Sequence, residues 1–198
     1  MRYRGEHKAE TRENILRSAA REIRMKGPDN VAVAAVMAGA GLTHGGFYAH
    51  FKSKEGLVAE AIDTMFADAH RRNPALSEAL ADPDADMSAA LRQYLTSYLS
   101  PAHRDTPGGG CPLPSLAADI ARGPGAARER FASGLDRLNA RIEFALARLD
   151  VADPRAEAAA VVTQMVGAVG LARAIGAGPQ SDAILHDSLA DLLQRLSL

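Results

Sequence analysis

The fold of this chain is decided by one stretch, Gly41-Leu42-Thr43-His44-Gly45-Gly46-Phe47-Tyr48-Ala49-His50-Phe51-Lys52-Ser53-Lys54-Glu55-Gly56-Leu57. Thr43 is placed to cap a very short helix that runs through about Phe51, and Ser53 to cap the next helix. Two consecutive glycines cost a helix about 1 kcal/mol each relative to alanine. Such a cost is accepted where the backbone must approach something closely, and a DNA backbone or base edge fits that need.

The segments before this stretch also have helical periodicity. Apolar residues at helical spacing predict a helix over residues 11–26, and Gly27-Pro28 ends it. A second short helix is expected over residues 31–38, followed by a turn at residues 40–42. Three helices, the last two joined by a tight glycine-containing turn, are typical of a helix-turn-helix, whose third helix enters the DNA major groove.

The rest of the chain predicts a helical bundle. Strand signals are nearly absent, so the expected fold class is all-α. A short helix or turn is expected at residues 76–81 and a Pro- and Gly-rich loop at residues 101–112. A further short helix is expected over residues 113–122, and the other expected helices cover residues 53–72, 86–100, 124–149, 154–175 and 181–196.

Charge is distributed unevenly along the 198 residues, whose net charge is −1. Residues 1–55 hold 10 basic against 6 acidic residues, whereas residues 56–198 hold 13 against 18. This asymmetry predicts two functional parts, a DNA-binding domain at residues 1–55 and a second domain at residues 56–198.

One cysteine excludes an internal disulfide framework. The N-terminus has no apolar signal segment and no uncharged apolar run reaches 18 residues, so we expect a cytoplasmic protein that does not span a membrane.

The stretch from Gly41 to Leu57 resembles the DNA-binding signature of TetR-type transcriptional regulators, and the preceding helix agrees in length and position. Residues 110–113 and 116–117 resemble one subgroup of these regulators. The resemblance implies a homodimer with an N-terminal helix-turn-helix domain and a C-terminal domain for ligand binding and dimerisation. It further implies a palindromic DNA operator and a small-molecule effector as partners.

Carried over by position, the resemblance implies which residues touch DNA. Tyr48, His50 and Lys54 match phosphate-contacting positions, and His44, Gly45 and Gly46 match positions that face base edges. Residues 31–38 lack the polar or arginine residue that many members use on the second helix. Sequence reading therefore shifts to the third helix and to an N-terminal arm. The full expected DNA-binding set is Thr43, His44, Gly45, Gly46, Tyr48, His50, Lys52, Lys54, Arg2 and Arg4. The alternative for the arm is a disordered, solvated terminus.

Large apolar and aromatic residues of the second domain are core residues or, in a family whose bundle encloses an effector cavity, pocket residues. The candidate ligand-binding set is Met65, Phe66, Tyr94, Tyr98, Cys111, Phe131, Phe144 and Met165. Effector binding is expected to shift the helix at residues 53–72, which joins the two domains. Residues 154–196 carry small residues that favour an intermolecular four-helix bundle, the alternative being a monomer core.

Three alternatives stay open at this point. Cys111, just before a predicted helix, is either a packing residue or a thiol whose oxidation or alkylation triggers the regulator. A second alternative is that the protein is an activator or architectural DNA binder without a ligand. An all-helical enzyme is disfavoured because no nucleophile–base pair, phosphate loop or metal-ligand spacing is present. No cofactor and no metal is expected, since Asp82, Asp84 and Asp86 lack the Gly and Glu of a calcium loop.

Overall fold

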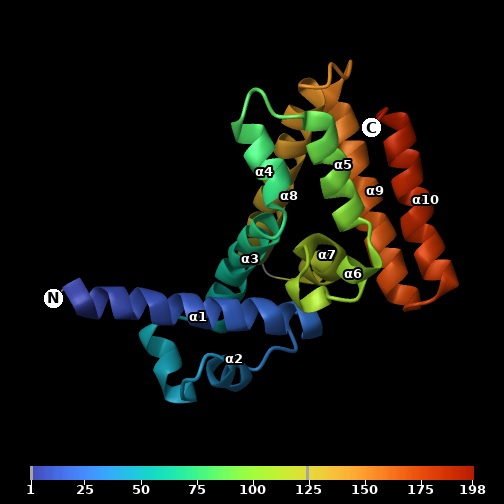
Figure 1. Cartoon of the computed structure of the whole chain (residues 1–198). Coiled ribbons are helices and arrows are strands. Elements are labelled where there is room, and N and C mark those ends of the chain that lie inside the picture. The colour runs from blue at the N-terminus through green and yellow to red at the C-terminus, as the bar shows by residue number, and fades with distance from the viewer. Residues whose placement is uncertain (1, 124) are drawn as a thin grey trace. The chain divides into compact units, whose positions relative to one another are not determined.

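The computed structural model describes the backbone of residues 2–123 and 125–198, and the side chains of residues 6–123 and 125–198. The described residues form helices and no strands, which confirms the all-α fold class. The helices, shown in Figure 1, are α1 (Arg2–Lys26), α2 (Val33–Gly39), the 3-10 helix η1 (His44–Ala49), α3 (Lys54–Arg71), α4 (Pro74–Ala81), α5 (Met87–Tyr98), α6 (Pro101–Arg104), the 3-10 helix η2 (Pro107–Gly109), α7 (Pro112–Arg122), α8 (Gly125–Ala147), α9 (Pro154–Ile175) and α10 (Pro179–Arg195).

Two positive-φ glycines end the helices of the N-terminal segment. Gly27 has φ +77° and donates its N–H to the carbonyl of Ile23, which closes α1. Gly41 has φ +74° in the turn between α2 and η1. Both positions require a backbone conformation that side chains with a Cβ rarely adopt. The first helix begins at Arg2, well before the predicted start at residue 11.

The cap predicted at Thr43 is wrong, while the cap predicted at Ser53 is confirmed. The Thr43 side chain makes no capping hydrogen bond, and its backbone carbonyl instead accepts from Gly46 N–H at 3.1 Å. This i to i+3 bond belongs to a 3-10 helix, which suits a short segment with two glycines. At the start of α3, Ser53 Oγ accepts from Gly56 N–H at 3.0 Å.

The segment at residues 101–112, predicted as a loop, contains two short helices, α6 and η2. Ser100 Oγ accepts from His103 N–H at 3.1 Å, and Pro101 occupies the first helical turn. Pro107 begins η2 in the same way. Sequence patterns miss these turns because each is too short to have an apolar period.

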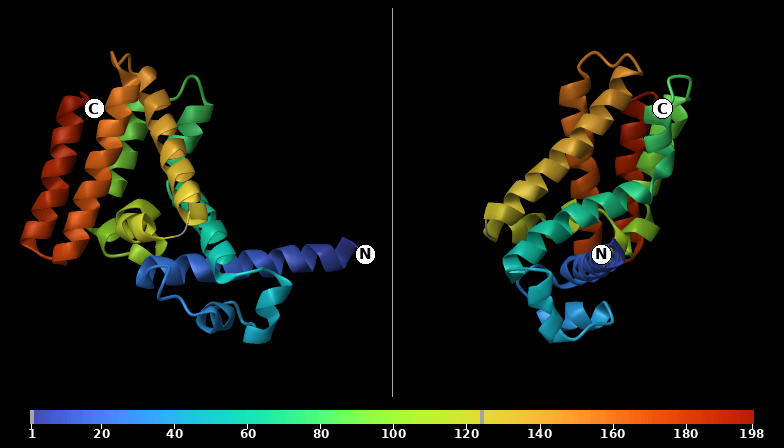
Figure 2. Two further views of the ribbon diagram at one scale, coloured as in Figure 1. Left: turned by 180° about the vertical axis from the view of Figure 1, so that it is seen from behind. Right: turned by 90° about the vertical axis from the view of Figure 1, so that its left-hand side faces the viewer.

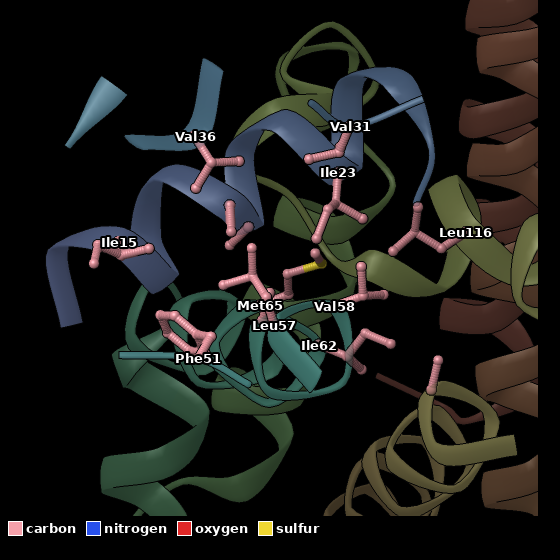
Figure 3. Packing of buried hydrophobic residues seen from close by; sticks show 14 of the residues in the cluster. Ile15, Ile23, Val31, Val36, Phe51, Leu57, Val58, Ile62, Met65 and Leu116 are labelled. Carbon is pink, nitrogen blue, oxygen red and sulfur yellow. The ribbon is translucent and has the colours of Figure 1, made fainter. Parts of the chain in front are cut away.

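Packing divides the chain into two compact units, each described separately. The first contains residues 1–68 and 111–133, and the second contains residues 69–110 and 134–198. In the first unit, Figure 3 shows Ile15 and Ile23 of α1 packed with Leu57 and Met65 of α3 and with Leu116 of α7. These five side chains are fully buried. The functional division expected at residue 55 stays a prediction.

The second unit is built around the antiparallel pair α9 and α10, which Figure 1 and the left view of Figure 2 show side by side. Buried Arg104 bonds to Ser181 Oγ at 2.8 Å and to Asp182 at 2.5 Å, and so ties α6 to the start of α10. Arg148 donates to four backbone carbonyls, those of residues 79, 82, 83 and 85. These bonds fix the connection between α4 and α5.

Helix α9 is apolar enough and long enough to cross a membrane, the only such helix in the described part of the chain. Its 18-residue window has a mean hydropathy of 1.6, and 39% of that window is buried. Gln164 on α9 donates to Ser188 O and to Asp191 on α10. The core helix of a soluble protein meets the same criteria of length and composition, so the property alone is weak evidence for a membrane.

Candidate nucleic-acid interface

Helix η1 is held to the first unit by aromatic side chains on its inner face. Phe47 and Phe51 are 2% and 4% exposed, and their rings stack with centroids 5.7 Å apart. The Arg12 guanidinium of α1 lies 4.6 Å from the centre of the Phe51 ring and pairs with Glu60 of α3. The aromatic pair therefore fixes the orientation of η1 without using its outer face.

The outer face of η1 carries polar groups that the core does not use. Tyr48 is 74% exposed, and its ring meets Phe47 edge-on at 5.2 Å. Thr43, His44 and Lys52 are exposed as well. Hydroxyl, imidazole and ammonium groups are thus exposed along residues 43–52, and such groups bind phosphates and base edges.

The two glycines of η1 have no steric requirement within the described structure. A Cβ added at Gly45 would meet nothing within 4 Å, and one at Gly46 would lie 3.5 Å from Met37 Cε, an ordinary contact. Neither residue has a positive φ. Gly39 differs, because a Cβ there would lie 2.4 Å from Ser18 Oγ, so close packing of α1 and α2 explains it. Nothing inside the described chain explains Gly45.

Lys54 has a structural contact that sequence reasoning did not foresee. Its ammonium donates to the carbonyl of Asp29 at 2.7 Å, which ties the start of α3 to the segment between α1 and α2. Two of its three N–H donors remain for other acceptors. The site residues therefore include one that also braces the helix-turn-helix.

His50 lies at the C-terminal end of η1 in a cationic environment. Its Nδ1 atom is buried and has no hydrogen-bond partner in the described part of the chain. Burial lowers the pKa of His50, and the charges of Lys8 and Arg12 lower it further. A phosphate beside this group would meet two cations as well as the imidazole. Lys8 and Arg12 were absent from the predicted site, although their i, i+4 spacing on the first helix indicates a shared face.

Arg2 and Arg4 lie in the first turn of α1, where the backbone is helical. Their side chains are outside the described residues, so their predicted groove contact stays a prediction. The neighbouring helix α2 has no charged side chain, and its exposed residues include Ala34, Ala35 and Ala38.

Two sequence families match this chain. Residues 15–61 match "Bacterial regulatory proteins, tetR family", and residues 87–186 match "Tetracyclin repressor-like, C-terminal domain". The chain belongs to the TetR family. It is therefore a transcriptional regulator with a helix-turn-helix DNA-binding domain. No curated protein sequence matches it.

Several solved structures share this fold at low sequence identity. Reduced E. coli NemR is 21% identical, with a TM-score of 0.79 over 93% of this chain and 96% of that one. A TetR regulator from Chloroflexus aurantiacus is 24% identical, with a TM-score of 0.79 over 97% and 96%. One from Cytophaga hutchinsonii is 18% identical, with a TM-score of 0.80 over 96% and 95%.

The residues predicted to line an effector site in this TetR-family chain are divided between the two units. In the first unit, the rings of Phe66 and Phe131 lie 6.2 Å apart and Met65 is fully buried. Cys111 is also in this unit, is 6% exposed and occupies the N-cap position of α7 without capping it.

In the second unit, the rings of Tyr94 and Tyr98 lie 6.1 Å apart, and Met165 is fully buried. Phe144 is 53% exposed. The structure therefore brings together two aromatic pairs from the predicted set, one in each unit. Their role in ligand binding stays a prediction.

Proposed function

We propose that the protein is a cytoplasmic, ligand-responsive repressor that binds a palindromic operator and is released by a small effector. The observation that carries this proposal is that η1 has a buried face that packs on the first unit and an exposed face with polar side chains. Phe47 and Phe51 are buried and hold the segment in place, while Tyr48, His44 and Gly45 are exposed. The proposal makes the protein act by binding rather than by catalysis.

An apolar face on α9 supports the homodimer through residues 154–196. Leu171 and Ile175 are 61% and 49% exposed, and Gly167 and Ala160 are exposed one and three turns earlier. Large apolar side chains next to small residues let two helices approach closely. A second copy of the same face would cover this surface, and the dimer would then carry two recognition elements for the two half-sites of a palindrome.

The response to an effector is assigned to α3. This helix begins at Lys54, next to the recognition element, and its last residues, from residue 69, belong to the second unit. An effector that binds one position of α3 better than another changes operator affinity by the ratio of its two affinities.

Selection from randomised duplex DNA tests the DNA-binding part. The wild-type chain should enrich an inverted repeat, and fluorescence anisotropy should then measure affinity for that sequence. Tyr48→Ala should weaken binding at least about tenfold, since a charged or hydrogen-bonded DNA contact is worth about 1–3 kcal/mol. Lys52→Gln should lower the slope of log affinity against log salt by about 2, from one phosphate per subunit. Arg92→Gln, an exposed change on α5, is the control. Failure to enrich any repeat contradicts the proposal.

Sedimentation analysis tests the dimer. Leu171→Glu places a charge on the proposed interface and should produce monomers with weakened operator binding. Met25→Glu changes a similarly exposed apolar residue of α1, at 57%, and should leave the dimer intact. A Leu171→Glu protein that remains dimeric would remove α9 from the interface.

A further inference from the structure

Arg141 on α8 is a partly buried cation with few acceptors. Its Nη2 donates to Ser77 Oγ at 2.9 Å, and no carboxylate within the described ranges bonds to it. Burial lowers its pKa, which indicates that the surroundings disfavour the charge. A guanidinium has five N–H donors, so most of its hydrogen-bonding capacity is unused by the chain.

Three other arginines of the second unit, one buried and two partly buried, are well satisfied. Arg104 bonds to Asp105, Asp182 and Ser181. Arg148 bonds to four carbonyls, and Arg173 donates to the carbonyls of residues 103 and 104. Arg141 differs from them because its one bonded acceptor is a neutral hydroxyl. A partly desolvated charge without a counter-ion destabilises a fold, and such positions commonly serve function.

Neutral polar groups and further positive charge surround Arg141. Ser77 Oγ lies 3.3 Å from Nε2 of His70. Burial lowers the pKa of Arg141, and Tyr94 opposes that shift electrostatically. Burial is the largest cause that lowers the pKa of His70, and the positive charges of Arg141 and Arg71 lower it further. The local field is therefore positive, with hydroxyl and imidazole groups beside the guanidinium. An anion is the ligand that such a group of side chains recognises.

Apolar residues flank this polar group along both helices. On α8, Leu138 and Ala145 lie about one turn before and after Arg141 and are buried. On α5, Leu91 and Tyr98 flank Tyr94 at helical spacing and are also buried. A ligand at Arg141 would thus have a charged end and an apolar body.

We propose that Arg141 anchors the carboxylate of the effector, with Ser77 and Tyr94 as further hydrogen-bonding partners, so that the effector class is small amphipathic organic acids. This inference rests on the proposed function, in which an effector releases the operator. It also gives the effector a route to α3. His70 is in the last turn of α3 and is linked to Arg141 through Ser77, so a carboxylate at Arg141 acts directly on the end of that helix.

Nuclear magnetic resonance of the arginine Nε–H groups tests the site with the simplest carboxylates. Formate, acetate and benzoate are titrated at constant ionic strength into the full-length wild-type protein, with acetamide and benzamide as uncharged counterparts. The Arg141 resonance should shift saturably with the acids and not with the amides. Arg141→Gln should lower benzoate affinity at least about 30-fold, as truncating one partner of a buried charge pair commonly does. Arg92→Gln, an exposed change on α5, should leave that affinity within twofold.

The melting temperature of the ligand-free protein provides a second readout. Arg141→Gln should melt at the wild-type temperature or above, because the substitution removes an uncompensated charge. A lowered melting temperature together with unsaturable titrations would show that Arg141 is a structural residue and overturn the inference. Operator binding is measured on the same samples. Loss of operator binding in the wild type refutes the proposed function, whereas intact operator binding without an acid response refutes only the anion site.

Discussion

Alanine substitutions at Gly41 and Gly45 should change stability in opposite directions, with Gly46 close to Gly45, although all three glycines lie within one short motif. At Gly41 the positive φ disfavours any residue with a Cβ. At Gly45 a Cβ would enter open space, and at Gly46 it would make an ordinary contact with Met37. The three substitutions therefore separate backbone strain, folding stability and close approach of DNA.

The expected magnitudes follow from these surroundings. Gly41→Ala should destabilise the fold by about 1–2 kcal/mol, the cost of a left-handed conformation in a residue with a Cβ. Gly45→Ala should stabilise the fold by about 0.4–1 kcal/mol, because alanine lowers the entropy of the unfolded chain and adds no clash. Gly46→Ala should lie within about 0.5 kcal/mol of that value, depending on how Met37 adjusts. Operator affinity should nevertheless fall at least about tenfold for Gly45→Ala, because a Cβ that displaces one base contact per subunit costs more than about 1 kcal/mol.

Urea denaturation followed by circular dichroism gives the free energies of unfolding, and anisotropy with the selected operator gives the affinities. The diagnostic result is a Gly45→Ala protein that is at least as stable as wild type and binds DNA more weakly. If operator affinity stays within twofold of wild type, close approach of DNA to Gly45 is refuted. If Gly45→Ala is destabilised by more than about 1 kcal/mol, the claim that a Cβ at residue 45 enters open space is refuted instead.

Three further predictions concern titration and thiol chemistry. Burial lowers the pKa of His103 to about 4; the charge of Arg173 lowers it further, while a hydrogen bond to the Tyr98 carbonyl opposes the shift. As pH falls, the unfolded chain therefore takes up a proton at this residue before the folded chain does. The free energy of unfolding should fall as pH falls from about 6.5 towards 4. The loss in the free energy of unfolding between pH 7.5 and 5 should be about 2 kcal/mol, and His103→Gln should remove most of it while exposed His186→Gln does not. The pKa of His50 is lowered in the free protein, and a bound phosphate should raise it. Operator affinity should therefore increase from pH 7.5 to 6 in the wild type, and increase less in His50→Gln. With His44→Gln as the comparison, a pH profile of His50→Gln that equals the wild-type profile would remove His50 from the phosphate site. Cys111 is 6% exposed, so the thiol of the native protein should react slowly with iodoacetamide. If the residue only packs, full alkylation should leave operator binding and release unchanged. Loss of operator binding or release after alkylation would support the thiol trigger.

The recognition segment could be predicted from sequence because its signals are local. Phe47 and Phe51 at i, i+4 spacing, the glycine turn at residue 41 and the Ser53 cap each act over a few residues, and all three are present in the structure. Thr43 failed as a cap because the helix that follows is a 3-10 helix, in which the backbone carbonyl accepts the bond. A sequence pattern does not distinguish these two arrangements.

Long-range polar contacts could not be predicted. The bond from Lys54 to the Asp29 carbonyl joins residues 25 positions apart, and that from Arg141 to Ser77 joins residues 64 apart. Neither has a periodic or compositional signal, because a long side chain reaches its acceptor through the tertiary fold. Size and aromaticity accordingly indicate Tyr94 as a candidate effector residue but give no signal for Arg141.

The separation of inner and outer faces on η1 has a consequence for the evolution of such regulators. Thr43, His44 and Tyr48 contribute little to the buried core, whereas Phe47 and Phe51 hold the segment in place. Outer residues can change freely without unfolding the domain, and α2 adds no charged group that would have to change with them. A gene duplicate could thus acquire a new target site through substitutions at these exposed positions alone. The same property makes this segment a practical starting point for re-targeting the regulator by design.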